Sequence, residues 1–184
     1  MTEEKKQRWL DAMNNLMKRR ADGGFSNQKP SPAGDYEAHI KKVHIGKNVL
    51  DIGCGSCAIT KYLPSDVGYL GLDPFPVENA EGNICKGNIE DQDINFEFPE
   101  TRPDTIIAFA VLDGCIDLPT ALSKMNALSK QNIVILTGID IEPDRYHTHK
   151  VQVKDLLDGL PDFDMKFAHW PETKVLLADF HRIK

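Results

Sequence analysis

Apolar runs and helical patterns alternate along the chain from about residue 47 onward. Five of these runs have the length expected of buried strands, and they lie near residues 48–52, 69–73, 83–86, 104–110 and 132–138. Helical patterns follow near residues 57–63, 118–129 and 152–158. Alternating strands and helices predict a parallel sheet with helices packed on its faces.

The helix expected at 118–129 has the clearest pattern. Its apolar positions share one face, and they are Leu118, Leu122, Met125 and Leu128. Asp117 is a good N-cap, and Pro119 in the first turn is compatible with a helix start. We therefore expect this helix to begin directly after Asp117.

The C-terminal region reads as two further strands. Residues 163–167 and 174–183 alternate in polarity, and we expect a turn between them at Trp170-Pro171-Glu172. Because a tight turn reverses the chain, one of these strands must run antiparallel. The sequence thus predicts a seven-stranded, mostly parallel sheet with an antiparallel C-terminal strand in an α/β fold.

The first 46 residues have a different organisation. Residues 3–20 predict an amphipathic helix, with Trp9, Leu10, Met13, Leu16 and Met17 on one stripe. Asn27 to Gly34 has the composition of a linker, and a short helix is expected from Asp35 to Val43. We interpret residues 1–46 as a helical cap with a linker, closing through Phe25 and Tyr36 over a core at 47–184.

The first strand runs into a glycine turn. One acidic residue precedes this turn, and a second one ends the next strand. Gly53 and Gly55 follow the strand, and Asp73 ends the next one, 22 positions after Asp51. A strand, a glycine turn, a helix and a carboxylate in this order are typical of an adenosine-type site, where the carboxylate binds ribose hydroxyls. A third glycine is missing, and Asp51 would repel a phosphate. This argues against a nucleotide-dependent dehydrogenase and favours a ligand carrying an ammonium or a sulfonium.

At these positions the sequence resembles the class I S-adenosylmethionine-dependent methyltransferases. Four segments match the family in order and spacing, and they are Asp51–Cys57, Asp73, Gly87–Asp91 and Val111–Asp117. Two residues depart from it: Cys57 replaces the last glycine of the first motif, and Gly114 stands where histidine is common. The resemblance runs from Asn48 to the C-terminus and implies a three-layer, Rossmann-like fold with S-adenosylmethionine as cofactor.

The resemblance also implies the cofactor-binding residues. Gly53 and Gly55 would give backbone access to the amino acid part, with Asp51 near its ammonium and the Ala110 carbonyl close by. Asp73 would bind the ribose hydroxyls. The neighbours Cys54 and Pro74 belong to the same two turns.

The adenine is expected beside the turn after the third strand. There the Asn88 side chain would bind the adenine amino group, and the Ile89 N–H would bind a ring nitrogen. Phe75 is a further candidate for packing against the ring. The alternative for Asn88 is a turn residue with no ligand.

Methyl transfer from a sulfonium depends mainly on positioning, so a base is needed only where the acceptor must lose a proton. Candidates at the expected carboxyl edge are Asp113, His147 and His149, with His169 and Trp170 in the final turn. We assign no base among them. His147 and His149 have no third ligand in sight, so we expect no metal.

Several observations narrow the chemical class of the methyl acceptor. The net charge of -6 argues against nucleic acid, and the segment Ala110–Asp113 lacks the Asp/Asn-Pro-Pro-Tyr sequence of enzymes that methylate base amino groups. A Pro-Cys nucleophile is missing as well. A small-molecule acceptor is the main hypothesis. A protein acceptor, and a non-catalytic S-adenosylmethionine-binding accessory protein, are the alternatives.

Composition indicates an ordinary globular protein. It is 41% hydrophobic and 27% charged, and no apolar run approaches the length of a membrane span. The N-terminus has no signal-peptide core, so cytoplasmic placement is expected. We expect reduced cysteines, no membrane partner, and a monomer or homodimer.

Overall fold

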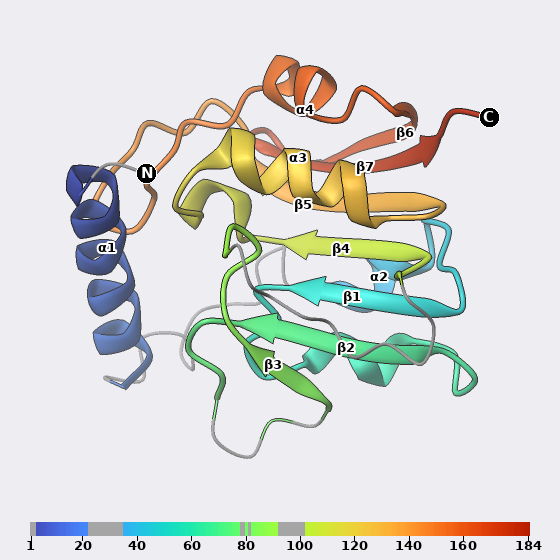
Figure 1. Cartoon of the computed structure of the whole chain (residues 1–184), viewed down its shortest axis with the longest axis horizontal. Coiled ribbons are helices and arrows are strands. Elements are labelled where there is room, and N and C mark those ends of the chain that lie inside the picture. The colour runs from blue at the N-terminus through green and yellow to red at the C-terminus, as the bar shows by residue number, and fades with distance from the viewer. Residues whose placement is uncertain (1–2, 22–34, 78–79, 81, 92–101) are drawn as a thin grey trace.

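The computed structural model in Figure 1 describes residues 3–21, 35–77, 80, 82–91 and 102–184. At its centre the strands form one sheet in the order β3-β2-β1-β4-β5-β7-β6. Their bounds are β1 Asn48–Ile52, β2 Gly68–Asp73, β3 Ile84–Lys86, β4 Thr105–Phe109, β5 Asn132–Gly138, β6 Phe163–Glu172 and β7 Val175–Arg182. Strands β1 to β5 pair in parallel, and β7 runs antiparallel to both β5 and β6. The predicted mixed sheet is confirmed.

Helices cover both faces of the sheet and make three layers. On one face lie α3 (Leu118–Leu128) and α4 (Val153–Gly159), and on the other lie α2 (Tyr36–Ile40) and the 3-10 helix η2 (Ala58–Tyr62). Successive strand residues point to opposite faces, so Leu50 packs with α3 and α4 while Val49 packs with α2 and η2. The two clusters of buried side chains lie on the faces of the sheet, so a site can form at the carboxyl ends of the parallel strands.

The start of α3 follows the sequence pattern closely. Asp117 is the N-cap, and its carboxylate accepts hydrogen bonds from the backbone N–H of Thr120 at 3.3 Å and from its hydroxyl at 2.7 Å. Pro119 lies in the first turn. These contacts satisfy helix N–H groups that have no partner within the helix, and the predicted helix start is confirmed.

Two local predictions need correction. The helix expected near 57–63 is the short 3-10 helix η2 at 58–62, and it ends at Leu63, which precedes Pro64 and takes an extended conformation (ψ 148°). The expected turn at Trp170-Pro171-Glu172 lies inside β6, and the chain reverses only after Glu172. As an edge strand paired with β7, β6 tolerates a proline that cannot donate a hydrogen bond.

Helix α1 (Glu3–Ala21) lies at the carboxyl ends of the central strands, at the left of Figure 1. Trp9 is buried and stacks on Phe75, with ring centroids 5.8 Å apart. Lys5 forms an ion pair with Asp117, and the Asn15 amide donates to the Arg145 carbonyl. Three contacts therefore fix α1 over this edge.

Parts of the expected cap lie outside the described residues, namely Phe25 and the linker 27–34. The division of the chain at residue 47 stays a prediction. None of the helices in the described ranges is long and apolar enough to cross a membrane.

Candidate active site

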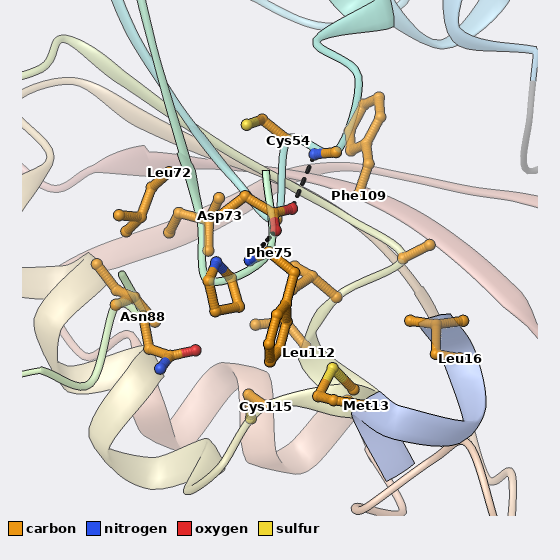
Figure 2. Close-up of a pocket in the computed structure, with 18 of the residues that line it drawn as sticks. Met13, Leu16, Cys54, Leu72, Asp73, Phe75, Asn88, Phe109, Leu112 and Cys115 are labelled. Carbon is orange, nitrogen blue, oxygen red and sulfur yellow. Dashed lines mark hydrogen bonds between the residues drawn. The ribbon is translucent and has the colours of Figure 1, made fainter. Parts of the chain in front are cut away.

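A cavity of about 610 Å³ lies between α1 and the carboxyl ends of β1, β2 and β4. Figure 2 shows side chains from the strand turns on one side and Met13 and Leu16 of α1 on the other. All nine residues predicted to bind the cofactor line this cavity: Asp51, Gly53, Cys54, Gly55, Asp73, Pro74, Asn88, Ile89 and Ala110. The structure thus brings the candidate residues together at one place, where open α/β sheets bind ligands.

The glycine turn after β1 requires glycine at its first position. Gly53 has φ +69°, and a Cβ there would lie 2.6 Å from Cγ2 of Val111. Its N–H donates to the Leu72 carbonyl at 2.7 Å, which holds the turn against β2. Backbone therefore lines the cavity here, and a ligand can approach it closely.

Cys57 replaces the third glycine of the motif and is fully buried with φ +59°. A left-handed conformation costs a non-glycine residue about 1 kcal/mol. The turn therefore has the shape that glycine would give it, at a small cost in strain.

Asp73 connects the two turns that flank the cavity. One carboxylate oxygen accepts from the Gly55 N–H at 2.9 Å, and the other accepts from the Phe75 N–H at 2.7 Å (Figure 2). The side chain is buried and lines the cavity. Each oxygen has a second lone pair, so the carboxylate can still accept hydrogen bonds from a ligand's hydroxyl groups.

Asp51 is a buried carboxyl below the glycine turn. Burial raises its pKa to about 7; the Tyr69 hydroxyl, which donates to it at 2.7 Å, acts in the opposite direction, and the nearby charge of Asp73 adds to the rise. Burial and the charge of Asp51 also raise the pKa of the Cys54 thiol well above its ordinary value. This end of the cavity is therefore electrostatically suited to a cation.

Ala110 directly follows β4 in a strained conformation. It has φ +52°, which is unusual for alanine, and its N–H donates to the Leu136 carbonyl at 2.7 Å. Backbone strain of this kind concentrates at functional sites. The strain lies at the position where the sequence predicted a ligand-binding carbonyl.

The adenine end is formed by the turns after β2 and β3. Asn88 lines the cavity, and its backbone N–H donates to the Asp91 carboxylate at 2.8 Å. Pro74 and Phe75 line the same cavity as Asn88. The turn interpretation and the ligand interpretation of Asn88 are therefore compatible, because backbone and side chain serve different purposes.

At the opposite end of the cavity, Asp113 and His147 face each other. Asp113 Oδ2 lies 3.7 Å from His147 Nε2, which is too long for a direct hydrogen bond. The other ring nitrogen, Nδ1, lies 2.9 Å from the Asp144 carboxylate. Although burial acts in the opposite direction, backbone N–H groups of Tyr146 and His147 keep the pKa of Asp144 below its ordinary value. The ionised Asp144 favours a proton on Nδ1 and leaves Nε2 as the acceptor facing the cavity.

The remaining base candidates lie elsewhere. The His149 ring contacts the Ile116 carbonyl at 3.2 Å and does not line the cavity. His169 lies in β6, where its ring is 3.0 Å from the Lys42 ammonium, and Trp170 lies on the same strand. None of these three side chains lines the cavity.

Sequence reasoning missed three contacts of the site. These are the Tyr69 hydroxyl on Asp51, the Asp144 carboxylate on His147, and the stacking of Trp9 on Phe75. Tyr36, expected in the cap, lines the cavity. Within the described ranges, no group of three His, Cys, Asp or Glu side chains is arranged to hold a metal ion.

Comparison with known proteins gives a family match. A family model described as a methyltransferase domain matches residues 1–173. The ribosomal protein L11 methyltransferase of Thermosipho africanus is 34% identical over 107 residues, which are 54% of this chain and 40% of that protein. The matched part thus spans well under two thirds of that relative.

Solved structures share the fold at low identity. A Burkholderia thailandensis 1,6-didemethyltoxoflavin-N1-methyltransferase, crystallised with 1,6-didemethyltoxoflavin and S-adenosylhomocysteine, has a TM-score of 0.72 at 13% identity and covers 100% of this chain and 92% of its own. A TehB-like S-adenosylmethionine-dependent methyltransferase from Corynebacterium glutamicum has a TM-score of 0.63 at 19% identity, over 92% and 97% of the two chains. These similarities confirm the architecture.

Proposed function

The chain belongs to the methyltransferase-domain family, and we propose that it transfers a methyl group from S-adenosylmethionine to a nitrogen, oxygen or carbon atom of a small molecule. The resemblance to the class I enzymes is confirmed by the family match. The cytoplasmic location and the oligomeric state expected from the sequence stay predictions.

The cofactor is proposed to lie along the three strand turns. Its amino acid part would lie at Gly53, Gly55 and the Ala110 carbonyl, where the ionised form of Asp51 attracts the ammonium. The ribose hydroxyls would bind the free lone pairs of the Asp73 carboxylate. These assignments are supported by the cavity that the residues line and by the carboxylates buried beside it.

The adenine would lie beside Pro74 and Asn88. Its amino group would donate to the Asn88 side-chain oxygen, and the Ile89 N–H would donate to a ring nitrogen. The adjacent Cys54 turn would close the other side. This placement directs the sulfonium methyl towards Asp113 and His147 at the far end of the cavity.

Transfer then needs one bond to form and one to break. When bound, S-adenosylmethionine would supply an activated methyl group: its carbon–sulfur bond would break with the electron pair returning to sulfur, as a lone pair of the acceptor forms the new bond and S-adenosylhomocysteine is released. Where the acceptor atom carries a proton, His147 Nε2 is the proposed group that receives it, with Asp144 positioning the ring. Positioning supplies most of the acceleration, because the sulfonium is already activated.

The observation that carries the small-molecule proposal is the docking of α1. Trp9 and Ala12 of α1 are buried, and Met13, Leu16 and Met17 line the acceptor side of the cavity. A folded protein acceptor would have to displace this helix to reach the methyl group. The second candidate, a protein acceptor, is favoured by the matched ribosomal protein L11 methyltransferase.

Two experiments test the proposal. Calorimetric titration with S-adenosylmethionine, S-adenosylhomocysteine and NAD should show binding of the two adenosyl ligands alone. The protein is then incubated with labelled S-adenosylmethionine and with cell extract separated by molecular size. The labelled methyl group should appear in the low-mass fraction. Label in the protein fraction would establish the second candidate, and binding without turnover in either fraction would establish the non-catalytic alternative.

A further inference from the structure

The acceptor side of the cavity is mostly apolar. Once the strand turns are assigned to the cofactor, the remaining wall consists of one face of α1, the Tyr36 ring and the loops after β4 and β5. From α1 come Trp9, Met13, Leu16 and Met17, and Figure 2 shows Met13 extending from the helix towards the Phe75 ring. Aromatic rings and methionines favour a flat apolar body.

Acidic side chains predominate around this wall. Of the described residues that line the cavity, four are carboxylates (Asp51, Asp73, Glu90 and Asp113), and none is lysine or arginine. Two of the carboxylates lie at the cofactor end. Glu90 accepts from the backbone N–H groups of Ile116 and Asp117, at 2.7 and 3.3 Å, and so fixes the loop before α3. Asp113 is left as the carboxylate of the acceptor side.

Asp113 is held in place by its backbone. Its carbonyl accepts from the N–H groups of Thr148 and His149 at 2.7 and 3.0 Å, which ties the loop after β4 to the loop after β5. Burial raises the pKa of its carboxyl, while His147 acts in the opposite direction. The gap of 3.7 Å between Asp113 Oδ2 and His147 Nε2 lets one donor group of a ligand reach both atoms.

We propose that this wall selects an acceptor with an aromatic, apolar body and a neutral or cationic N–H or O–H group, which donates to Asp113, and that it rejects anionic acceptors. The inference rests on the proposed function in one respect: the cofactor is taken to occupy the other end. An anion placed beside Asp113 would meet like charge in a partly dry site, and the described wall offers no lysine or arginine to compensate it. A protonated amine would gain from the same field.

The test uses three probes that share one ring system: tryptamine, tryptophol and indole-3-acetate. The full chain, saturated with S-adenosylhomocysteine, is titrated with each by calorimetry near neutral pH. Tryptamine and tryptophol are expected to bind, and indole-3-acetate about tenfold or more weakly than both. Asp113→Asn should reduce the difference between tryptamine and indole-3-acetate to about threefold or less. The matched control Asp158→Asn removes one exposed charge outside the cavity and should leave the difference unchanged.

Equal or stronger binding of indole-3-acetate would overturn the inference, and so would absence of binding by all three probes. Failure of S-adenosylhomocysteine to bind would instead overturn the proposed function. In that case the three probes are titrated without S-adenosylhomocysteine, and the order of their affinities would still decide the inference.

Discussion

Asp73 accepts a hydrogen bond from the Gly55 N–H at 2.9 Å, so the carboxylate that ends β2 also fixes the glycine turn that follows β1. Its other oxygen holds the Phe75 N–H at 2.7 Å. One side chain therefore shapes two walls of the cavity before any ligand arrives. A residue expected only to bind ribose also has a structural role.

Asp73→Ala is expected to affect stability and cofactor affinity together. The substitution leaves two backbone donors without their buried partner, at a cost of about 2–4 kcal/mol in the free energy of unfolding. Binding of S-adenosylhomocysteine should weaken by about tenfold or more. Asp73→Asn keeps one acceptor oxygen and should fall between wild type and Asp73→Ala in both urea unfolding and calorimetry. Equal stability of the alanine variant and wild type would contradict the structural role.

Gly53 and Gly114 provide a matched pair of glycine substitutions. Gly53→Ala combines a φ of +69° with a contact of 2.6 Å to Val111, and should lower the free energy of unfolding by about 2 kcal/mol or more. Among the described residues, an added Cβ at Gly114 meets only the Met13 methyl, at 3.6 Å, so Gly114→Ala should change stability by about 0.5 kcal/mol or less. Urea unfolding of both variants tests this prediction. Similar losses in the two would show that the turn after β1 tolerates a side chain.

The raised pKa of Asp51 predicts a pH dependence of stability. The folded protein holds this proton up to about pH 7, whereas the unfolded chain releases it near the ordinary value of 3.8. The stabilisation from this group is complete below pH 3.8 and is lost as the pH rises to about 7. Urea unfolding measures the free energy of unfolding at each pH. Between pH 3.8 and about 7, this free energy should decline less in Asp51→Asn than in wild type, by up to about 1.4 kcal/mol per pH unit. Parallel curves for the two proteins would contradict the shift.

The same carboxyl predicts how cofactor affinity changes with pH. Tyr69, Asp73 and Cys54 surround Asp51, and the ionised form is the one that attracts the ligand's ammonium. The affinity for S-adenosylhomocysteine should rise as the pH increases from about 6 to 7.5. Asp51→Asn should flatten this rise, and calorimetry at several pH values measures it. A rise of the same size in the variant would assign the effect to another group.

The sequence predicted most of the site because its residues follow strands that pair side by side. Asp51 lies in β1, Gly53 follows it and Asp73 ends β2, and parallel pairing brings these positions together. Ala110 joins them because β4 pairs with β1 on the other side. Spacing along the chain, together with the family resemblance, is sufficient to identify such residues.

Contacts between distant elements could not be predicted in this way. The hydrogen bond from Tyr69 to Asp51 and the bond between Asp144 and His147 depend on side-chain directions that only packing determines. The final turn was misplaced because Pro171 normally indicates a turn, whereas on an edge strand its missing N–H has no consequence. Tertiary position overrides the local signal in each case.

The packing of Trp9 indicates how α1 is held over the cavity. Its side chain is 7% exposed and stacks on Phe75 at 5.8 Å, yet it belongs to neither of the two buried clusters of the core. Trp9→Ala should therefore release α1 without unfolding the sheet, since a helix of 19 residues is marginal in water on its own. Hydrogen exchange of residues 3–21 should become faster, and S-adenosylhomocysteine should bind several-fold more weakly. Exchange in β4 and β5 should stay slow.

Met17→Ala is the matched control, because this side chain is on the same helix but 37% exposed. It should leave the exchange of α1 close to wild type, since less apolar area is lost from water. Equal exchange in Trp9→Ala and wild type would show that the Lys5–Asp117 ion pair and the Asn15 contact hold the helix by themselves. Exposed ion pairs contribute about 1 kcal/mol or less, so we expect the aromatic stack to control whether α1 closes over the acceptor.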